Sequence, residues 1–392
     1  MRKVVVVSGV RTAIGTFGGT LKDTPAPELM GLVIREAIAR AGIAPETVGE
    51  VIVGQCMQRL DEVVTGRLSA LKAGLPITVP GATIHRNCAS AMQSVIYGAQ
   101  QIMLGDQDVV VAGGVEVMSR TPHTVHQARW GAKLQHTTLS DGILEGLTDP
   151  ACGLIMGLTA ENLAEKYGIS REEQDEIALR SHNNAEAATT SGKFAEEIVP
   201  VPIPQRRGEP VMFDKDEHFR PGLTIDQLAR LKPSFKPDGT VTAGNAAGIN
   251  DGAAAMVLMG EDKARELGVT PLAVLRGYGL AGVEPELMGY GPVPATKQAL
   301  ERTGLKLSDI ELIELNEAFA AQYLACEKLM GFRRDICNVN GSGIALGHPV
   351  GCTGARIIIS LLNEMRRRGN SLGLATLCAG GGMGMSTIWE TV

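Results

Sequence analysis

Two cysteines stand where their surroundings favour nucleophilic or acid–base chemistry. Cys88, in NCAS, comes just before a predicted helix. Free N–H groups and the helix dipole at such a position would favour a thiolate and lower the cysteine pKa. Cys378 is followed by one alanine and then three consecutive glycines, in LCAGGGMG, and Gly380 could present a bare backbone N–H to a ligand oxygen. A nucleophile and an acid or base are therefore candidates at two distant points of the chain.

A histidine and an asparagine complete the set. His348 is held between a glycine and a proline in ALGHPVG, and Asn316 follows the apolar run LIEL. Each of these residues also has an ordinary structural interpretation. Cys88 could be an inert buried cysteine, His348 a turn histidine, and Asn316 the cap of the helix EAFAAQYL. His85 is a rival base, three residues before Cys88.

The elements that must position these residues alternate between strand and helix. Buried strands are predicted over 3–10, 48–55 and 108–119, a strand-like stretch over 83–87 (TIHRN), and amphipathic helices over 25–42 and 89–106. This alternation indicates an α/β layered fold.

The pattern occurs twice in the chain. The same spacing separates Gly42 from Gly54 and Gly304 from Asn316, and comparable spacings lead on to Cys88 and His348. Two similar halves are therefore predicted. Residues 1–118 with 250–270 form the first and 271–392 the second. Residues 119–249, rich in proline after position 200, form an inserted loop domain.

The bulk composition excludes several classes of protein. The chain has 392 residues, 44% of them hydrophobic, with a net charge of −6 and a pI near 5.7. We expect no nucleic-acid or membrane partner. The seven cysteines show no paired spacing, so no metal site is expected, and a reducing, cytoplasmic setting is predicted.

Taken together, six motifs of the chain resemble those of the thiolases, and within them the acetyl-CoA acetyltransferases. They are SGVRTAIGTFGG (8–19), NCAS (87–90), TAGNAAGINDGAAA (242–255), NEAF (316–319), GHPVGCTGAR (347–356) and CAGGGMG (378–384). The resemblance implies the thiolase fold, an α/β fold with two similar five-layered α/β/α/β/α halves and an inserted domain that binds coenzyme A. It implies no permanently bound cofactor, because coenzyme A is a substrate or product.

The resemblance also implies the roles of the site residues. Cys88 is the nucleophile, His348 the base and Cys378 the acid or base. One oxyanion hole would come from His348 with a water held by Asn316, and the other from the N–H groups of Cys88 and Gly380. Cysteine suits thioester exchange, because its acyl product is again a reactive thioester.

Further positions match substrate-binding residues of the family. Arg220 matches a position near the coenzyme A phosphates, for which a guanidinium is suited. The other predicted contacts are Met156, Phe235, Ala243, Ala247, Met288 and Phe319, for which core packing is the ordinary interpretation. Ile155 and Ala247 stand where short-chain members carry His and Ser, so longer 3-ketoacyl chains could be accepted.

Three functions follow in order of preference. The first is acetyl-CoA C-acetyltransferase, which interconverts two acetyl-CoA with acetoacetyl-CoA and CoA. The second is a broader 3-ketoacyl-CoA thiolase of fatty-acid breakdown, and the third is an acyl-CoA-binding module without activity. A homodimer or homotetramer is expected from the family, with tetramers formed through residues 120–145. Cys88 and Cys378, facing one cleft, could be linked reversibly by mild oxidant.

Overall fold

The computed structural model describes residues 2–134 and 136–392. Its strands are β1 (Val4–Thr12), β2 (Gly15–Thr16), β3 (Glu50–Gly54), β4 (Gly81–Ile84), β5 (Val109–Val117), β6 (His123–Thr124), β7 (Ser140–Asp141), β8 (Ile198–Val199), β9 (Val201–Ile203), β10 (Val211–Phe213), β11 (Asn250–Gly260), β12 (Ala273–Gly282), β13 (Leu312–Leu315), β14 (Leu372–Ala379) and β15 (Met383–Thr391). Its α-helices are α1 (Ala26–Ala41), α2 (Thr65–Lys72), α3 (Ser90–Leu104), α4 (Gly142–Gly146), α5 (Met156–Tyr167), α6 (Arg171–Thr190), α7 (Ile225–Ala229), α8 (Glu261–Leu267), α9 (Pro292–Thr303), α10 (Ala320–Met330), α11 (Gly343–Leu346) and α12 (Thr353–Arg368). Short 3₁₀ turns lie at Pro45–Thr47, Met118–Arg120, Ala128–Trp130, Pro285–Tyr290, Leu307–Asp309 and Arg334–Ile336.

The strand order repeats between the two parts of the chain. In the first, the order is β4-β3-β5-β11-β1, with β3 parallel to β4 and β5, and β11 antiparallel to β5 and β1. In the second, β13-β14-β15-β12 follows the same pattern, and a parallel bridge between Ile313 and Cys337 stands where β4 pairs with β3. A short antiparallel pairing of β1 with β12 joins the two sheets.

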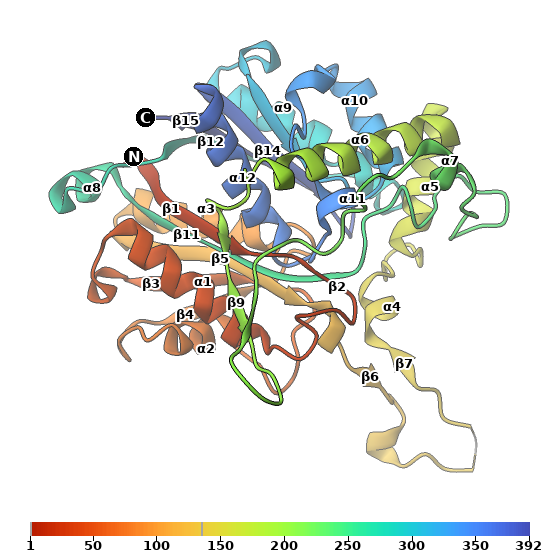
Figure 1. Cartoon of the computed structure of the whole chain (residues 1–392), viewed down its shortest axis with the longest axis horizontal. Helices are drawn as coiled ribbons and strands as arrows, with labels where there is room; N and C mark the ends of the chain where they lie inside the picture. The colour runs from red at the N-terminus through yellow and green to blue at the C-terminus, as the bar shows by residue number, and fades with distance from the viewer. Residues whose placement is uncertain (1, 135) are drawn as a thin grey trace.

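The layers follow from strands that are buried on both faces. Val5 and Val7 of β1 pack into an outer core with α1 and α2, while Val4 and Val6 pack into a central core with α3 and α12. A third core joins β13 and β14 to α9 and α10. Helices α3 and α12 thus lie between the sheets, and the five layers run across both halves (Figure 1).

One predicted strand is shorter than expected. The stretch 83–87 forms a strand only to Ile84, because Asn87 adopts a left-handed conformation with φ 46° and the chain turns before α3. This turn places Cys88 between β4 and α3, at the inner end of a central helix.

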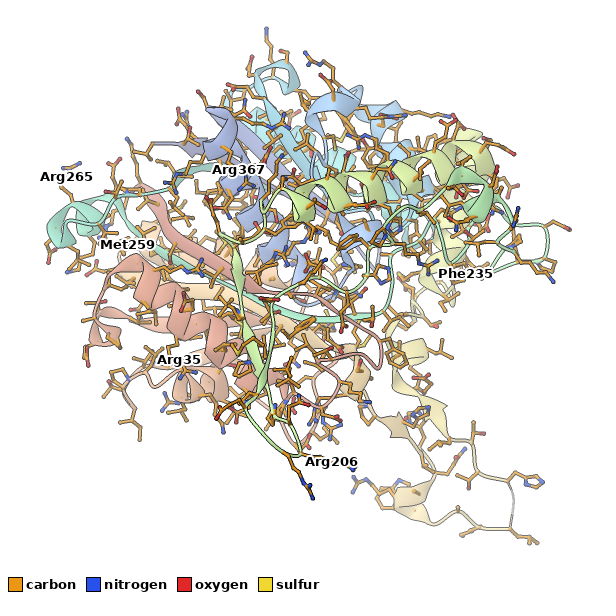
Figure 2. All side chains as sticks on the ribbon, viewed as in Figure 1. Arg35, Arg206, Phe235, Met259, Arg265 and Arg367 are labelled. Carbon is orange, nitrogen blue, oxygen red and sulfur yellow. The ribbon has the colours of Figure 1, made fainter. Side chains whose placement is uncertain are left out.

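The region between β5 and β11 leaves the sheet and returns to it. Buried Arg11 of β1 pairs with Glu197 and Asp216, both at 2.7 Å, and so fixes this region to the first sheet. An arm projects from the body (Figure 1). The arm comprises residues 123–134 and 136–141 and includes β6 and β7. Figure 2 shows Arg206 at the tip of the β9–β10 hairpin. Among the described residues, no helix is long and apolar enough to cross a bilayer.

Candidate active site

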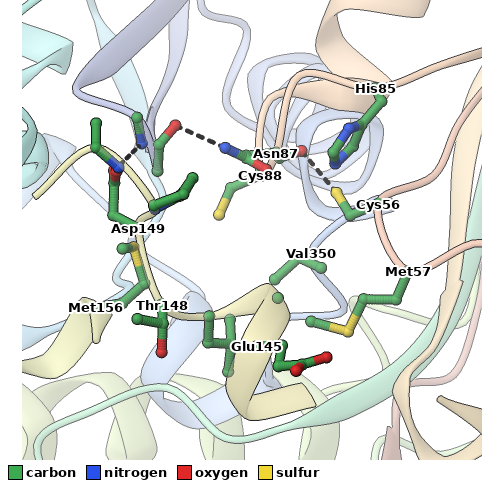
Figure 3. Close-up of a pocket in the computed structure, with 16 residues that line it drawn as sticks. Cys56, Met57, His85, Asn87, Cys88, Glu145, Thr148, Asp149, Met156 and Val350 are labelled. Carbon is green, nitrogen blue, oxygen red and sulfur yellow. Dashed lines mark hydrogen bonds between the residues drawn. The ribbon is translucent and has the colours of Figure 1, made fainter. Parts of the chain in front are cut away.

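A cavity of about 420 Å³ opens where the loops of the two halves meet (Figure 3). Cys88 and Gly380 line it, with apolar walls from Met57, Leu147 and Val350. Cys88 and Val350 belong to one apolar cluster, so the cysteine lies beside the loop that follows His348. A small organic group bound to Cys88 would be enclosed by side chains of both halves.

Cys88 is a thiol at rest. Burial raises its pKa to about 11, although the backbone N–H groups of Gly380 and of Cys88 itself interact with the sulfur and act in the opposite direction. The expectation of a lowered pKa is therefore wrong, because desolvation outweighs the helix start. A base is needed to remove the proton. The same two N–H groups could stabilise the oxyanion that forms when the Cys88 sulfur attacks a carbonyl carbon.

The glycine turn after Cys378 is tied to the Cys88 loop. The Asn87 side chain donates to the Gly380 carbonyl at 2.8 Å, and the Gly381 N–H donates to the Asp149 carboxylate at 2.7 Å. Gly382 has φ 71°, and a Cβ there would lie 2.2 Å from the Val283 carbonyl oxygen. These contacts aim the Gly380 N–H at Cys88, and the turn requires glycine.

His348 is a buried, neutral imidazole whose tautomer is fixed by its neighbour. Thr353 Oγ1 donates to the Pro349 carbonyl at 3.0 Å and lies 2.7 Å from His348 Nδ1. Since its one hydrogen is used, the hydroxyl accepts from Nδ1–H, which leaves the lone pair on Nε2. Burial and the Arg356 charge lower the His348 pKa to about 3. His85, by contrast, is exposed at the rim of the cavity.

Asn316 is not a helix cap, because α10 begins only at Ala320 with Phe319 as its N-cap. Its Nδ2 lies 3.5 Å from both nitrogens of His348, and its buried Oδ1 has no hydrogen-bond partner among residues 2–134 and 136–392. A buried amide oxygen without a protein partner is suited to a water or a substrate group. Asn316 and His348 therefore lie side by side, and the oxyanion hole expected from His348 and a water on Asn316 stays a prediction.

Cys378 is the second-to-last residue of strand β14 and is completely buried. Burial raises the pKa of its thiol well above the ordinary value, and the neighbouring Cys88 and Cys326 sulfurs add to this. Cys378 is therefore a protonated thiol close to Cys88. Both cysteines are free thiols.

The predicted apolar contacts belong to one hydrophobic cluster, and one of them lines the cavity. Phe235 packs on Gly157 and meets Phe319 edge to face with centroids 6.2 Å apart. Met156 lines the cavity, and its sulfur would lie 3.3 Å from a Cβ on Gly380. The remaining apolar prediction, Met288, is 2% exposed and lies in the core of the second half.

The predicted polar and backbone contacts lie farther out. Arg220 is exposed and lines a separate hollow of about 310 Å³, away from Cys88. Ala243 is exposed, and the partly buried Ala247 donates its N–H to the Ala318 carbonyl at 2.9 Å. They would meet a long ligand that extends outward, not the reacting atoms.

Sequence reasoning missed several residues that organise the site. Thr353 sits within a quoted motif, but nothing in its type signals that it fixes an imidazole tautomer. Asn250 accepts the His348 N–H at 3.0 Å from a strand about a hundred positions away. Glu116, which is completely buried, accepts three backbone N–H groups around the cavity. Only packing brings these residues together.

Comparison with known proteins agrees over the full chain. Residues 4–262 match the family description "Thiolase, N-terminal domain" and residues 269–391 match "Thiolase, C-terminal domain". An acetyl-CoA acetyltransferase of Cupriavidus necator is 52% identical over 100% of both chains, and beta-ketothiolase BktB of the same organism is 51% identical over 100% of both.

Solved structures give the same result. The acetyl-CoA acetyltransferase of Bacillus anthracis has a TM-score of 0.99 at 54% identity and covers 100% of this chain and 99% of its own. Human mitochondrial 3-ketoacyl-CoA thiolase in complex with CoA has a TM-score of 0.96 at 43% identity, covering 100% and 98%. The fold and the site define an acyltransferase. The chain belongs to the thiolase family.

Proposed function

We propose that this chain is an acetyl-CoA C-acetyltransferase that interconverts two acetyl-CoA with acetoacetyl-CoA and CoA through an acetyl group on Cys88. The observation that carries the proposal is one arrangement: a thiol under two backbone N–H groups, next to a second buried thiol and beside the loop that follows a neutral imidazole. The names of the relatives at about half identity support the same activity.

In the direction of cleavage, the resting protonation states fit the first step. His348 Nε2 takes the proton of Cys88, and the sulfur attacks the 3-keto carbon of acetoacetyl-CoA. The Gly380 and Cys88 N–H groups stabilise the resulting oxyanion. When the carbon–carbon bond breaks, the departing acetyl-CoA enolate takes the proton of Cys378.

His348 then has a second role. Having accepted the proton, Nε2–H can donate to the enolate oxygen, together with a water held by Asn316. In the second part of the reaction, Cys378 recovers a proton from the thiol of free CoA. The sulfur of CoA then attacks the acetyl group on Cys88. Cys88 leaves as a thiolate and takes back the proton from His348, which returns all groups to their starting states.

The chain is proposed to need no permanently bound cofactor. Coenzyme A is proposed to lie along the inserted region. Phe235, Phe319 and Met156 would flank its pantetheine arm, with Ala243 and Ala247 beside them, and the buried Met288 would support this wall from the core behind it. Exposed Arg220 would meet its phosphates. The cytoplasm remains the proposed location, in keeping with seven free cysteines.

A homodimer or homotetramer is also proposed. The arm exposes Trp130 at 83%, Leu134 at 100% and Leu139 at 63% of their surface. Large apolar side chains exposed together favour contact with another copy of the chain. Light scattering with mass determination would measure the assembly.

A broader 3-ketoacyl-CoA thiolase is the second candidate. The cavity walls at Met57, Leu147 and Val350 are apolar and could accept a chain longer than acetyl. The similarity of the chain to beta-ketothiolase BktB and to human 3-ketoacyl-CoA thiolase also supports this candidate.

The test is to mix the protein with acetoacetyl-CoA, quench, and map the peptides by mass spectrometry. An acetyl adduct on Cys88 with acetyl-CoA in solution is the expected result. An adduct formed only with longer 3-ketoacyl-CoA substrates would favour the second candidate. No adduct with any chain length would leave an acyl-CoA-binding module.

A further inference from the structure

Glu116 has no part in the reaction above, yet its carboxylate is completely buried near the end of β5. Oε2 accepts the N–H groups of Cys56 at 2.9 Å and Gly351 at 3.0 Å, and Oε1 accepts that of Met57 at 3.0 Å. Two of the donors belong to the β3–α2 loop, and the third belongs to the loop that follows His348. One carboxylate therefore joins loops of both halves.

The contacts continue to the nucleophile. The Cys56 thiol donates to the Asn87 carbonyl at 2.9 Å, and Asn87 Nδ2 donates to the Gly380 carbonyl at 2.8 Å. A path of hydrogen bonds thus runs from the loop after His348, through Glu116, to both sides of Cys88. Figure 3 shows its part at Cys56 and Asn87.

The packing at this point allows little adjustment. A Cβ on Gly351 would lie 2.6 Å from Glu116 Oε2, and a Cβ on Gly114 would lie 2.0 Å from the Gly351 carbonyl oxygen. Both positions hold glycine, so the His348 loop approaches β5 as closely as backbone can. The carboxylate fills the remaining space and supplies its hydrogen-bond acceptors.

The charged surroundings of Glu116 are unusual. Within residues 2–134 and 136–392, no lysine or arginine forms an ion pair with it, and the titratable groups that face it are the thiols of Cys56, Cys88 and Cys352. Burial raises the Glu116 pKa to about 7, against the effect of its N–H donors. In its ionised form it raises the pKa of both Cys56 and Cys88.

We propose that Glu116 is a positioning residue that holds the His348 loop and the Cys88 loop in register across the boundary between the two halves. Its charge also acts on Cys88, and this gives the proposal a readout that packing alone would not change. The effect on turnover rests on the proposed function. The effect on Cys88 alkylation needs no substrate.

The experiment compares Glu116→Gln and Glu116→Asp with Glu161→Gln. Glu161 is a matched control, since it is 2% exposed and accepts the Thr240 and Val241 N–H groups. Steady-state cleavage of acetoacetyl-CoA gives kcat and KM. The rate of Cys88 alkylation by iodoacetamide, followed by peptide mapping from pH 8 to pH 12, gives the alkylation midpoint, since the Cys88 pKa is about 11.

Glu116→Gln should lower kcat by about tenfold or more, with KM changed by less than about twofold, because two charged acceptors are lost. Its alkylation midpoint should move to lower pH, since the negative charge near Cys88 is gone. Glu116→Asp should restore the midpoint but not kcat, because the shorter side chain keeps the charge and loses the reach. Glu161→Gln should keep the wild-type midpoint.

An unchanged kcat in Glu116→Gln, or a lowered kcat with an unchanged midpoint, overturns the proposal. If Glu116→Gln does not fold, Cys56→Ala interrupts the same path at its thiol, and wild-type kcat there overturns it as well. Wild-type protein without any turnover, but with Cys88 alkylated as expected, would count against the proposed function alone.

Discussion

Thr353→Val tests the assignment of the His348 tautomer. In the wild type, the Thr353 hydroxyl accepts Nδ1–H at 2.7 Å inside the protein, and this leaves Nε2 free to accept a proton. Valine has nearly the same shape but cannot accept a hydrogen bond. The productive tautomer then carries an unpaired buried N–H, which costs about 1–3 kcal/mol.

The size of the effect follows from that cost. If the other tautomer escapes it, the productive tautomer becomes less populated by about fivefold to 150-fold, at 1.4 kcal/mol per factor of ten. The acylation rate of Cys88 should fall by the same factor. Rapid quenching of the protein with acetyl-CoA, followed by mass measurement, gives that rate directly.

Thr353→Ser is the matched control. It keeps the hydroxyl that donates to Pro349 and accepts from His348. It should acylate within about threefold of the wild type, because only a methyl group is lost. Wild-type acylation in Thr353→Val, or an equal loss in both variants, would refute the tautomer argument.

Three further predictions concern pH, packing and chain length. Burial lowers the His182 pKa to about 4, so the unfolded state binds a proton that the folded state refuses and stability falls as pH drops from 6.5 toward 4. In urea unfolding, His182→Gln should therefore lose about 2 kcal/mol less than the wild type between pH 7 and pH 5, and an equal loss would contradict this. Gly382→Ala should lower Tm clearly more than Gly304→Ala, because both have φ near 70° but only the first would meet a carbonyl oxygen at 2.2 Å. Gly146→Val adds bulk at a position where a Cβ would already lie 3.0 Å from Met57. The kcat/KM for longer 3-ketoacyl-CoA should therefore fall by about fourfold per excluded CH₂, whereas that for acetoacetyl-CoA should change little. An equal fall for all chain lengths would place the acyl chain elsewhere.

The fold was predictable because its signals are local and repeated. Continuous β-branched runs such as 3–10 mark strands buried on both faces, and the repeated spacing of glycines marks the two halves. The end of α1 at Gly42, with φ 66°, follows from glycine chemistry alone. The shortened strand at 83–87 was not predictable, because the turn depends on Asn87 reaching the Gly380 carbonyl almost three hundred positions away.

The residue types of the site were predictable from the sequence, but their protonation states were less so. Motifs place a thiol at 88, an imidazole at 348 and a second thiol at 378, and the structure brings them to one region. The Cys88 pKa was predicted in the wrong direction, since a helix start is visible in sequence whereas the depth of burial is not.

The amino-acid sequence by itself determined which groups are present, the α/β class and the duplicated order of elements, because these depend on residue type and short-range spacing. Tertiary structure alone decided the protonation states and the connections between loops. Thr353 selects a tautomer, and Glu116 gathers three N–H groups from two halves, only after the sheets have packed against α3 and α12. Desolvation and long-range hydrogen bonds exist only in the folded chain, and they turn a set of reactive residue types into an arrangement able to transfer an acyl group.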